Sequence, residues 1–326
     1  MSTSILPLIQ IQMNFYAYPI VLVVGNIGNI FTLIIFYRQK RNACSIYLMN
    51  SAVTNILYLT ISGLFRIYSY SYTDDTMRSL ILCRLSMFIP SFLGQVTKTL
   101  LIFACIDRYM ITSSRTSFRA FSTLKRAKYF TFFIFLFWTI AASHTLIWLN
   151  MNNGQCATSG NYGTFYGFYA VIFIGLVPSI IICVFAYLTY KNMKQLRNRI
   201  QSTGLELNQR NNCLKRRDRD LLILVMSEVI IYIITTSPMT IMYLERMITQ
   251  FILPNKSVQL LQIEYFALNA TFLMIFIFSA APFYTYYISS ASFREDWKQL
   301  ILTNYQKIRH INVDHSVSRR HQTVIR

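Results

Sequence analysis

The chain has 326 residues, of which 54% are hydrophobic and only 13% charged, and its formal net charge is +19. A soluble protein of this length needs a charged surface over one or two domains, so the composition argues against a soluble fold. The apolar residues cluster into stretches of about 20, the length a helix needs to cross a hydrocarbon core about 30 Å thick. The basic residues flank these stretches, where anionic lipid and cytosolic partners are their counterparts, and we therefore discount nucleic-acid binding.

Seven such stretches predict an all-α membrane protein, a seven-transmembrane helix bundle. The predicted spans are residues 15–37, 46–65, 85–106, 129–149, 164–190, 221–244 and 265–288. Most of the 31 Lys and Arg residues follow the first, third, fifth and seventh spans. By the positive-inside rule these four segments are cytoplasmic, so the N-terminal residues 1–14 are expected outside the cell. No removable signal peptide is recognised there, and we expect the first span to target itself.

Two cytoplasmic segments carry further patterns. Residues 291–303 place four apolar side chains at helical spacing between charged ones, namely Phe293, Trp297, Leu300 and Ile301. This spacing predicts a short amphipathic eighth helix on the inner membrane surface. The tail that follows, residues 304–326, is polar and basic and is expected to be disordered. The basic loop at about 191–220 is expected to prolong its two flanking helices into solvent.

Ordered landmarks lie along the seven spans. The third span ends in Asp107-Arg108-Tyr109 and carries Cys83 at its outer end. The others are Gly28-Asn29 in span one, Trp138 in span four, Cys156 in the second outer loop, and Pro178, Pro238 and Pro282 in the last three spans. Over residues 20–302 this set resembles the rhodopsin-like (class A) G-protein-coupled receptors. The short N-terminus and Ser292-Phe293-Arg294 are similar to invertebrate neuropeptide receptors of the FMRFamide type.

The resemblance implies a multi-pass receptor of the plasma membrane that couples an extracellular ligand to a heterotrimeric G protein when the sixth helix moves outward. It implies that Arg108, flanked by Asp107 and Tyr109, is masked in the closed bundle and contacts the G protein in the open one. Asp218, at the inner end of the sixth helix, is a second candidate partner for Arg108. The alternative is a static ion pair at the helix end. The resemblance also implies a disulfide between Cys83 and Cys156.

Charged residues inside the spans are limited to Lys98 and Glu228. An unpaired charge near the bilayer centre is costly, so we expect these two to pair directly and to latch the third helix to the sixth. The alternative is that each is neutralised separately. Asn29 and Asn55 complete the expected polar layer. Asn55 stands where the family pattern has an acidic sodium ligand, so no sodium site is expected, nor any other metal or cofactor.

The candidates for the ligand pocket combine charged, polar and aromatic groups: Arg66, Pro90, Gln95, Glu245, Glu264 and Tyr265. Pro90 stands where amine receptors carry a carboxylate, and the seventh span has no lysine for retinal, so neither ligand is expected. A rim of both charges with tyrosines fits a peptide, and a neuropeptide is the expected ligand. A small-molecule chemosensory ligand is the alternative. Asn255 begins a glycosylation sequon in the last outer loop.

Two other protein classes fit the sequence less well, and one family position stays open. A membrane transporter or channel could line an ion path with Lys98 and Glu228. The lack of a visible internal repeat and the Asp107-Arg108-Tyr109 motif argue against it. No cluster of catalytic residue types lies at one depth, so the chain is not expected to be an enzyme. After Pro282, Thr285 stands where the family pattern has a tyrosine, and which neighbouring tyrosine takes that role is undecided.

Overall fold

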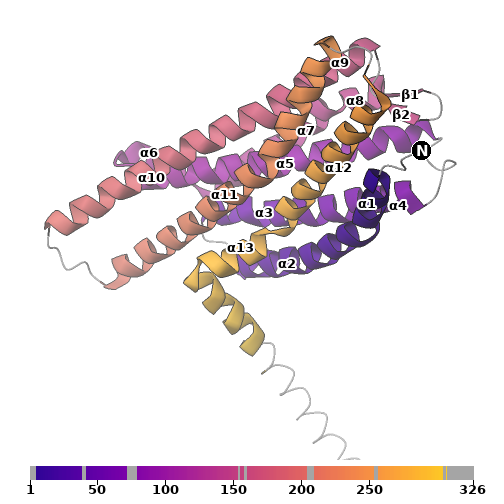
Figure 1. Cartoon of the computed structure of the whole chain (residues 1–326). Coiled ribbons are helices and arrows are strands. Elements are labelled where there is room, and N and C mark those ends of the chain that lie inside the picture. The colour runs from indigo at the N-terminus through magenta and orange to yellow at the C-terminus, as the bar shows by residue number, and fades with distance from the viewer. Residues whose placement is uncertain are drawn as a thin grey trace, which may run out of the picture.

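The structure is a computed structural model that describes residues 5–38, 42–71, 79–152, 155–157, 160–203, 209–252, 256–303 and residue 306. Within these residues it has seven helices that are long and apolar enough to cross a membrane. Figure 1 shows them side by side as one elongated bundle. The prediction of an all-α, seven-transmembrane fold is therefore confirmed.

The first four spans comprise the following elements. Span one consists of α1 (Ile5–Gln12), a π-helical turn η1 (Met13–Ala17) and α2 (Tyr18–Arg38). Span two consists of α3 (Ala43–Leu57), the π-helical turn η2 (Tyr58–Ser62) and α4 (Gly63–Ser71). Span three is α5 (Leu80–Thr112), and α6 (Thr116–Phe121) follows it. Span four consists of α7 (Leu124–Ala142) and α8 (His144–Trp148).

A two-stranded antiparallel hairpin separates spans four and five. It pairs β1 (Asn150–Asn152) with β2 (Gln155–Ala157), and Met151 lies opposite Cys156. Span five consists of α9 (Gly160–Tyr169), the π-helical turn η3 (Ala170–Leu176) and α10 (Val177–Thr203). Span six is α11 (Gln209–Ile252), and span seven consists of α12 (Val258–Ala280) and α13 (Pro282–Ser289). A further helix covers residues 291–303.

The first helix begins earlier than the sequence predicted. It starts at Ile5, whereas the predicted span starts at residue 15, so part of segment 1–14 is helical. Residues 5–12 are mostly apolar, and Pro7 lies in the first turn, where its missing amide costs no intrahelical hydrogen bond. Three buried residues, Gln10, Asn14 and Tyr18, follow one another at four-residue spacing on this helix and face the bundle.

The two ends of the bundle differ in what they carry. Figure 1 places the N-terminus, β1, β2 and α9 at one end, and α6 with the far ends of α10 and α11 at the other. We call these the outer and inner ends, following the positive-inside prediction. The long helices α10 and α11 extend into the basic loop from both sides, and solvation of these extensions stays a prediction.

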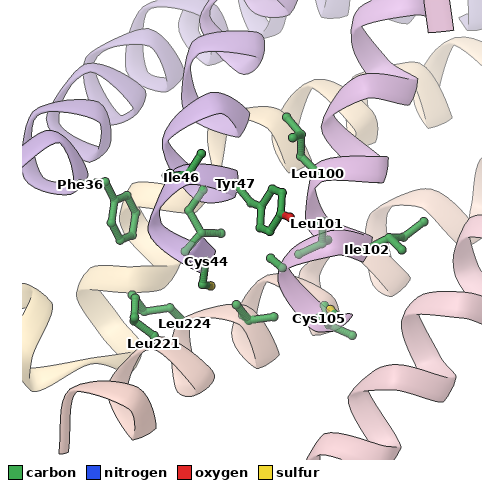
Figure 2. Close-up of a cluster of buried hydrophobic side chains, with 14 of the residues drawn as sticks. Phe36, Cys44, Ile46, Tyr47, Leu100, Leu101, Ile102, Cys105, Leu221 and Leu224 are labelled. Carbon is green, nitrogen blue, oxygen red and sulfur yellow. The ribbon is translucent and has the colours of Figure 1, made fainter. Parts of the chain in front are cut away.

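An apolar cluster fills the inner half of the bundle. Figure 2 shows its side chains meeting from α2, α3, α5 and α11, among them Phe36, Tyr47, Leu101 and Leu224. Lipid is as apolar as these side chains, so close packing rather than escape from water holds the helices together. Along α5 the cluster residues Leu101 and Cys105 lie between Lys98 and Arg108. The apolar cluster therefore separates the polar groups of the mid-bundle from the inner end.

Candidate functional site

The inner end of α5 holds a buried ion pair. Arg108 is only 1% exposed, and its Nη2 donates to the Asp107 Oδ2 at 2.7 Å. Ser122 is the first residue after α6, and its hydroxyl donates to the other carboxylate oxygen of Asp107, Oδ1. Both oxygens of Asp107 are thus engaged, which fixes the carboxylate beside the guanidinium. A charge-assisted hydrogen bond of this kind is about twice as strong as a neutral one.

Tyr109 and Asp218 are the two other residues predicted to act at the inner end of the bundle. Tyr109 packs its ring against Phe185 of α10, with ring centroids 5.7 Å apart, and so joins the third span to the fifth. Asp218 lies in α11, but its side chain lies outside the part of the chain that the structure describes in detail. The predicted contact between Asp218 and Arg108 therefore stays a prediction.

A neutral polar chain crosses the middle of the bundle. Asn29 Nδ2 donates to the carbonyls of Gly25 at 2.8 Å and Ser279 at 2.9 Å. Asn55 Nδ2 approaches Asn29 Oδ1 at 3.5 Å, and the Thr97 hydroxyl donates to Asn55 Oδ1 at 3.4 Å. The chain joins spans one, two, three and seven. The two asparagines predicted for the polar layer are thus brought together.

Close packing at Gly25 makes this polar chain possible. A Cβ placed on Gly25 would lie 2.6 Å from the Ala280 Cβ and 2.7 Å from the Leu59 Cδ1. Real side chains do not approach so closely, so only glycine lets α2 come this near to spans two and seven. The short separation brings the Ser279 carbonyl within reach of Asn29 on the neighbouring helix.

Lys98 does not take the partner predicted for it. It is 5% exposed, and its Nζ donates to the Ile174 carbonyl in η3 at 3.0 Å. Backbone pairing is interrupted in this segment, because the Val177 N–H bonds to the Ile172 carbonyl five residues back and Pro178 has no N–H. The ammonium group donates to a carbonyl in the segment where the π-helical turn and Pro178 interrupt this pairing. The prediction of a direct Lys98–Glu228 pair is therefore wrong.

Glu228 pairs with the seventh span instead. It is 2% exposed, and its Oε2 accepts a hydrogen bond from the Tyr286 hydroxyl in α13. One turn further on α13, the Ser289 hydroxyl donates to Ser227 at 3.3 Å, so two adjacent contacts join α11 to α13. The other carboxylate oxygen, Glu228 Oε1, is buried without a hydrogen-bond partner in the described structure. Glu228 thus joins the sixth helix to the seventh helix and not to the third.

The geometry of α13 decides which tyrosine faces the bundle. Span seven breaks at Ala281, and α13 restarts at Pro282. Thr285 donates to the carbonyls of Ala281 and Pro282 on its own helix, whereas Tyr286 is 1% exposed and reaches Glu228. Tyr286 thus occupies the inward position that the sequence left undecided.

At the outer end, Arg66 turns inward from α4. Its Nη1 donates to the Asn269 Oδ1 at 3.2 Å, and its guanidinium carbon lies 4.1 Å from the centre of the Phe272 ring. Both partners belong to α12, so Arg66 joins span two to span seven. A guanidinium over an aromatic ring gains about 0.5–2 kcal/mol from the ring quadrupole. The Tyr18 hydroxyl also approaches the Asn269 carbonyl, at 3.5 Å.

The remaining pocket candidates do not converge on one site. Pro90 is half-buried in the middle of α5, and Gln95, one turn before Lys98, donates to the Phe173 carbonyl at 3.3 Å. Glu245 of α11 has one carboxylate oxygen buried without a hydrogen-bond partner in the described structure. The Tyr166 hydroxyl, one of the tyrosines of the predicted rim, shares hydrogen bonds with Ser91 and Tyr243 and links spans three, five and six.

Two of the candidates lie together at the start of α12. Glu264 accepts from Lys256, which also donates to the Thr249 hydroxyl at 2.6 Å. Tyr265 is 56% exposed and lines a shallow hollow of about 350 Å³ between α11 and α12, whose other walls include Arg246 and Glu264. Arg66 is not among the residues that line this hollow. The residues predicted to form one rim around the ligand thus lie in two separate places. Arg66 lies between spans two and seven, whereas Glu264 and Tyr265 line the hollow at the start of α12.

Three predicted features fall at the edge of what the structure describes. Cys83 is buried at the outer end of α5 and is disulfide-bonded. Cys156 lies in β2, but its side chain is outside the described part. Asn255 of the glycosylation sequon is also outside the described residues. Among the residues that are described, no group of three or more His, Cys, Asp or Glu is placed to hold a metal ion.

Some partners escaped the sequence analysis, and one of them had a usable signal. Pro178 has no N–H and so leaves a backbone carbonyl about one turn earlier without its amide donor, and a lysine on a neighbouring helix can donate to a carbonyl there. Ser122 and Asn269 carry no such signal, because nothing in the local sequence indicates which distant helix their side chains meet.

Comparison with known proteins gives two findings. The family model described as "7 transmembrane receptor (rhodopsin family)" matches residues 25–284. The chain is 30% identical over 141 residues to "Probable G-protein coupled receptor 34" of Mus musculus, an alignment that covers 42% of this chain and 36% of that protein. The protein of the same name from Pan troglodytes is 27% identical over 140 residues, with the same coverage. The chain thus spans about a third of the length of these curated relatives.

Proposed function

This chain belongs to the rhodopsin family of seven-transmembrane receptors, and we propose that it transmits the binding of an extracellular peptide to a heterotrimeric G protein. Membership in that family together with seven apolar helices makes it a multi-pass protein of the plasma membrane. The family consists of receptors and not of enzymes. The relatives named above are probable G-protein-coupled receptors, which supports the same class.

The observation that carries the proposal is the buried pair of Arg108 and Asp107 at the inner end. A guanidinium that is 1% exposed is stable only while it keeps its charge partner, because an unpaired buried charge is strongly destabilising. Outward movement of α11 opens the inner end to water and to a protein partner. Arg108 then offers its five N–H donors to backbone carbonyls or to a carboxylate of the G protein.

The Glu228–Tyr286 contact opposes the outward movement of α11, because the hydrogen bond must break before α11 can leave α13. It joins α11 to α13 below the mid-bundle polar chain, and Ser227–Ser289 lies beside it on the same face. Both contacts break if α11 swings away while α13 stays in place. The closed state is thereby favoured until ligand binding at the outer end supplies a larger free energy for the open one.

The proposal of a peptide ligand is supported by the mixture of charged and aromatic groups at the outer end. It presents the cation Arg66, the carboxyl group of Glu245 and the hydrogen-bonded tyrosines Tyr166 and Tyr243. Peptides carry both charges and aromatic side chains, which such a surface can match. The narrower resemblance to FMRFamide-type receptors stays a prediction. So does glycosylation of Asn255.

We also propose that the disulfide of Cys83 is made with Cys156. Cys156 pairs with Met151 in the hairpin, and β1 contacts α5, whose outer end carries Cys83. The bond would fasten the second outer loop over the bundle, close to any ligand that enters there. Oxidising conditions outside the cell allow it.

The transporter or channel alternative gains nothing from the geometry. Lys98 and Glu228 take separate partners, Ile174 in η3 and Tyr286 in α13, and so do not line a common path. Apolar side chains fill the inner half of the bundle. These apolar side chains separate the two charges from the inner end in the described structure, so the buried groups fit the proposed receptor function better than an ion path.

The direct test is a peptide-library screen in cells that express a promiscuous G protein. We expect at least one peptide to raise nucleotide exchange on the G protein, and Arg108→Ala to abolish that response while surface expression persists. Arg126→Ala is the matched control, since Arg126 is an exposed cation of the inner end that donates to the carbonyls of Ala120 and Phe121. An undiminished response of the Arg108→Ala variant would remove the proposed role of this arginine.

A further inference from the structure

A polar cluster at the junction of spans one, two and seven has unused hydrogen-bonding capacity. Arg66 donates to Asn269, but no carboxylate lies within ion-pair distance of its guanidinium among the described residues. The guanidinium nevertheless sits over Phe272 rather than extending into solvent. A cation held among aromatic rings with only a neutral acceptor is poorly compensated, and it favours an anion arriving from outside.

Asn14 provides the second, independent observation. It lies in η1, which contacts α4, and it is 2% exposed. Neither its Nδ2 nor its Oδ1 has a hydrogen-bond partner in the described structure. An amide buried without partners is destabilising, and no residue that the structure describes gives Asn14 a hydrogen bond. Tyr18, one turn along the helix from Asn14, and Arg66 both reach Asn269, so the orphan amide and the cation belong to elements that pack around the same residue. An unpartnered amide donor and a cation without a described carboxylate partner are the groups that an oxyanion site requires.

The surrounding residues hold these groups in position. Asn269 donates its Nδ2 to the Tyr265 carbonyl at 3.0 Å, which turns its Oδ1 toward Arg66. Tyr18, one turn from Asn14 on the same buried stripe, approaches the carbonyl of Asn269 and packs edge-on against Phe276, with ring centroids 4.9 Å apart. The cluster is therefore fixed by contacts within the bundle and is not a chance meeting of surface side chains.

We propose that Arg66 and Asn14 form a subsite that receives the carboxylate of the extracellular ligand, oriented by Asn269. This inference rests on the proposed function, since it names the chemistry of the ligand that the receptor binds. One guanidinium matches the single negative charge of a carboxylate and can bind both of its oxygens with its fork of N–H groups. A phosphate monoester, with a charge of about −1.5 to −2 at neutral pH, would need further cations.

The aromatic rings add a preference for what is attached to the carboxylate. Phe272, Phe276, Tyr18 and Tyr58 form apolar walls beside the cluster, with Tyr58 and Phe276 ring centroids 5.1 Å apart. A peptide with a free C-terminal carboxylate next to an apolar residue fits both features. A peptide whose C-terminus is an amide lacks this negative charge, so the inference departs from the FMRFamide-type prediction, in which the ligand ends in an amide.

The test uses the purified full-length receptor in detergent and needs neither a known agonist nor a G protein. Its thermal unfolding is followed by tryptophan fluorescence, because Trp138 is buried in the bundle. The probes are phenyl phosphate, N-acetylphenylalanine and its amide, the last two of which differ only in a terminal carboxylate or carboxamide. We expect the acid to raise the melting temperature with saturation, and the amide to have no such effect.

Three variants identify the site. Arg66→Gln should lose the response to the acid, and Asn14→Leu should need about ten times more of it, the equivalent of one hydrogen bond of about 1.4 kcal/mol. Arg84→Gln is the matched control and should keep the full response, since Arg84 is an outer-end cation bonded to the carbonyls of Leu149 and Ile147. Should Arg66→Gln not fold, Arg66→Lys keeps the charge without the fork and should also weaken the response.

Three outcomes would overturn the inference. They are an equal response to acid and amide, an undiminished response of the Arg66 variants, and stabilisation by phenyl phosphate without stabilisation by the acid. None of these depends on G-protein coupling. A receptor that binds the acid at Arg66 but activates no G protein would contradict the proposed function alone.

Discussion

Replacing Tyr286 with phenylalanine isolates the contact between α11 and α13. The change removes one hydroxyl and leaves the ring in its place, so the apolar packing of the buried side chain against Phe36 is retained. What is lost is the hydrogen bond to Glu228. The substitution therefore tests the latch without creating a cavity, which would destabilise the bundle for a different reason.

The expected magnitude follows from the kind of bond. A hydrogen bond to a carboxylate contributes about 1.5–3 kcal/mol, which corresponds to a factor of about 10–150 in an equilibrium constant. If the bond exists only in the closed state, its loss shifts the equilibrium toward the open state by up to that factor. A receptor that is open about 1% of the time would then be open about 10% of the time or more.

The assay is ligand-independent nucleotide exchange on a promiscuous G protein, at matched surface expression. Tyr286→Phe should raise basal exchange several-fold, and Glu228→Leu should do the same. Glu228→Gln keeps an acceptor for the hydroxyl and should have a smaller effect. The matched control is Tyr287→Phe, which removes a hydroxyl from the neighbouring position, where the ring packs against Trp297.

The double variant Tyr286→Phe with Glu228→Leu separates a direct contact from two unrelated effects. If the two residues act through one bond, the double variant should resemble either single variant. Additive effects, or basal exchange that stays at the wild-type level in Tyr286→Phe, would show that the bond does not hold the sixth helix.

Four other predictions concern separate parts of the bundle. Lys98→Met and Glu228→Gln should combine additively in basal exchange, because the two residues take different partners; a strong interaction would restore the direct pair. Asn29→Leu should lower the stability of the purified receptor by about 0.6–2 kcal/mol, seen as a lower melting temperature, since it loses two hydrogen bonds to carbonyls. Cys83→Ser should cost about 2–5 kcal/mol and leave an additional free thiol detectable by mass spectrometry; an unchanged thiol count would contradict the disulfide. Arg108→Ala should abolish agonist-driven exchange at normal surface expression, and retained exchange would refute its role.

The sequence alone determined the architecture, because the signal for a membrane helix is local. Each span is an uninterrupted apolar stretch, since a backbone surrounded by lipid must satisfy its own hydrogen bonds as a helix. Arg108 and Asp107 are adjacent in the chain, so their pairing also needed no knowledge of the fold. Helix ends were less well predicted, since an apolar or basic helix can continue past the membrane, as span one does from Ile5.

The partners of the intramembrane charges were decided only by the tertiary structure. Placing Lys98 and Glu228 at one depth was reasonable, but depth does not tell toward which neighbouring helix a side chain points. Rotation of α5 directs Lys98 to the Ile174 carbonyl in η3, and the break before Pro282 turns Tyr286 toward Glu228. A few tens of degrees of rotation about a helix axis choose between such partners. That rotation is set by packing against all neighbours at once, which no single stretch of sequence encodes.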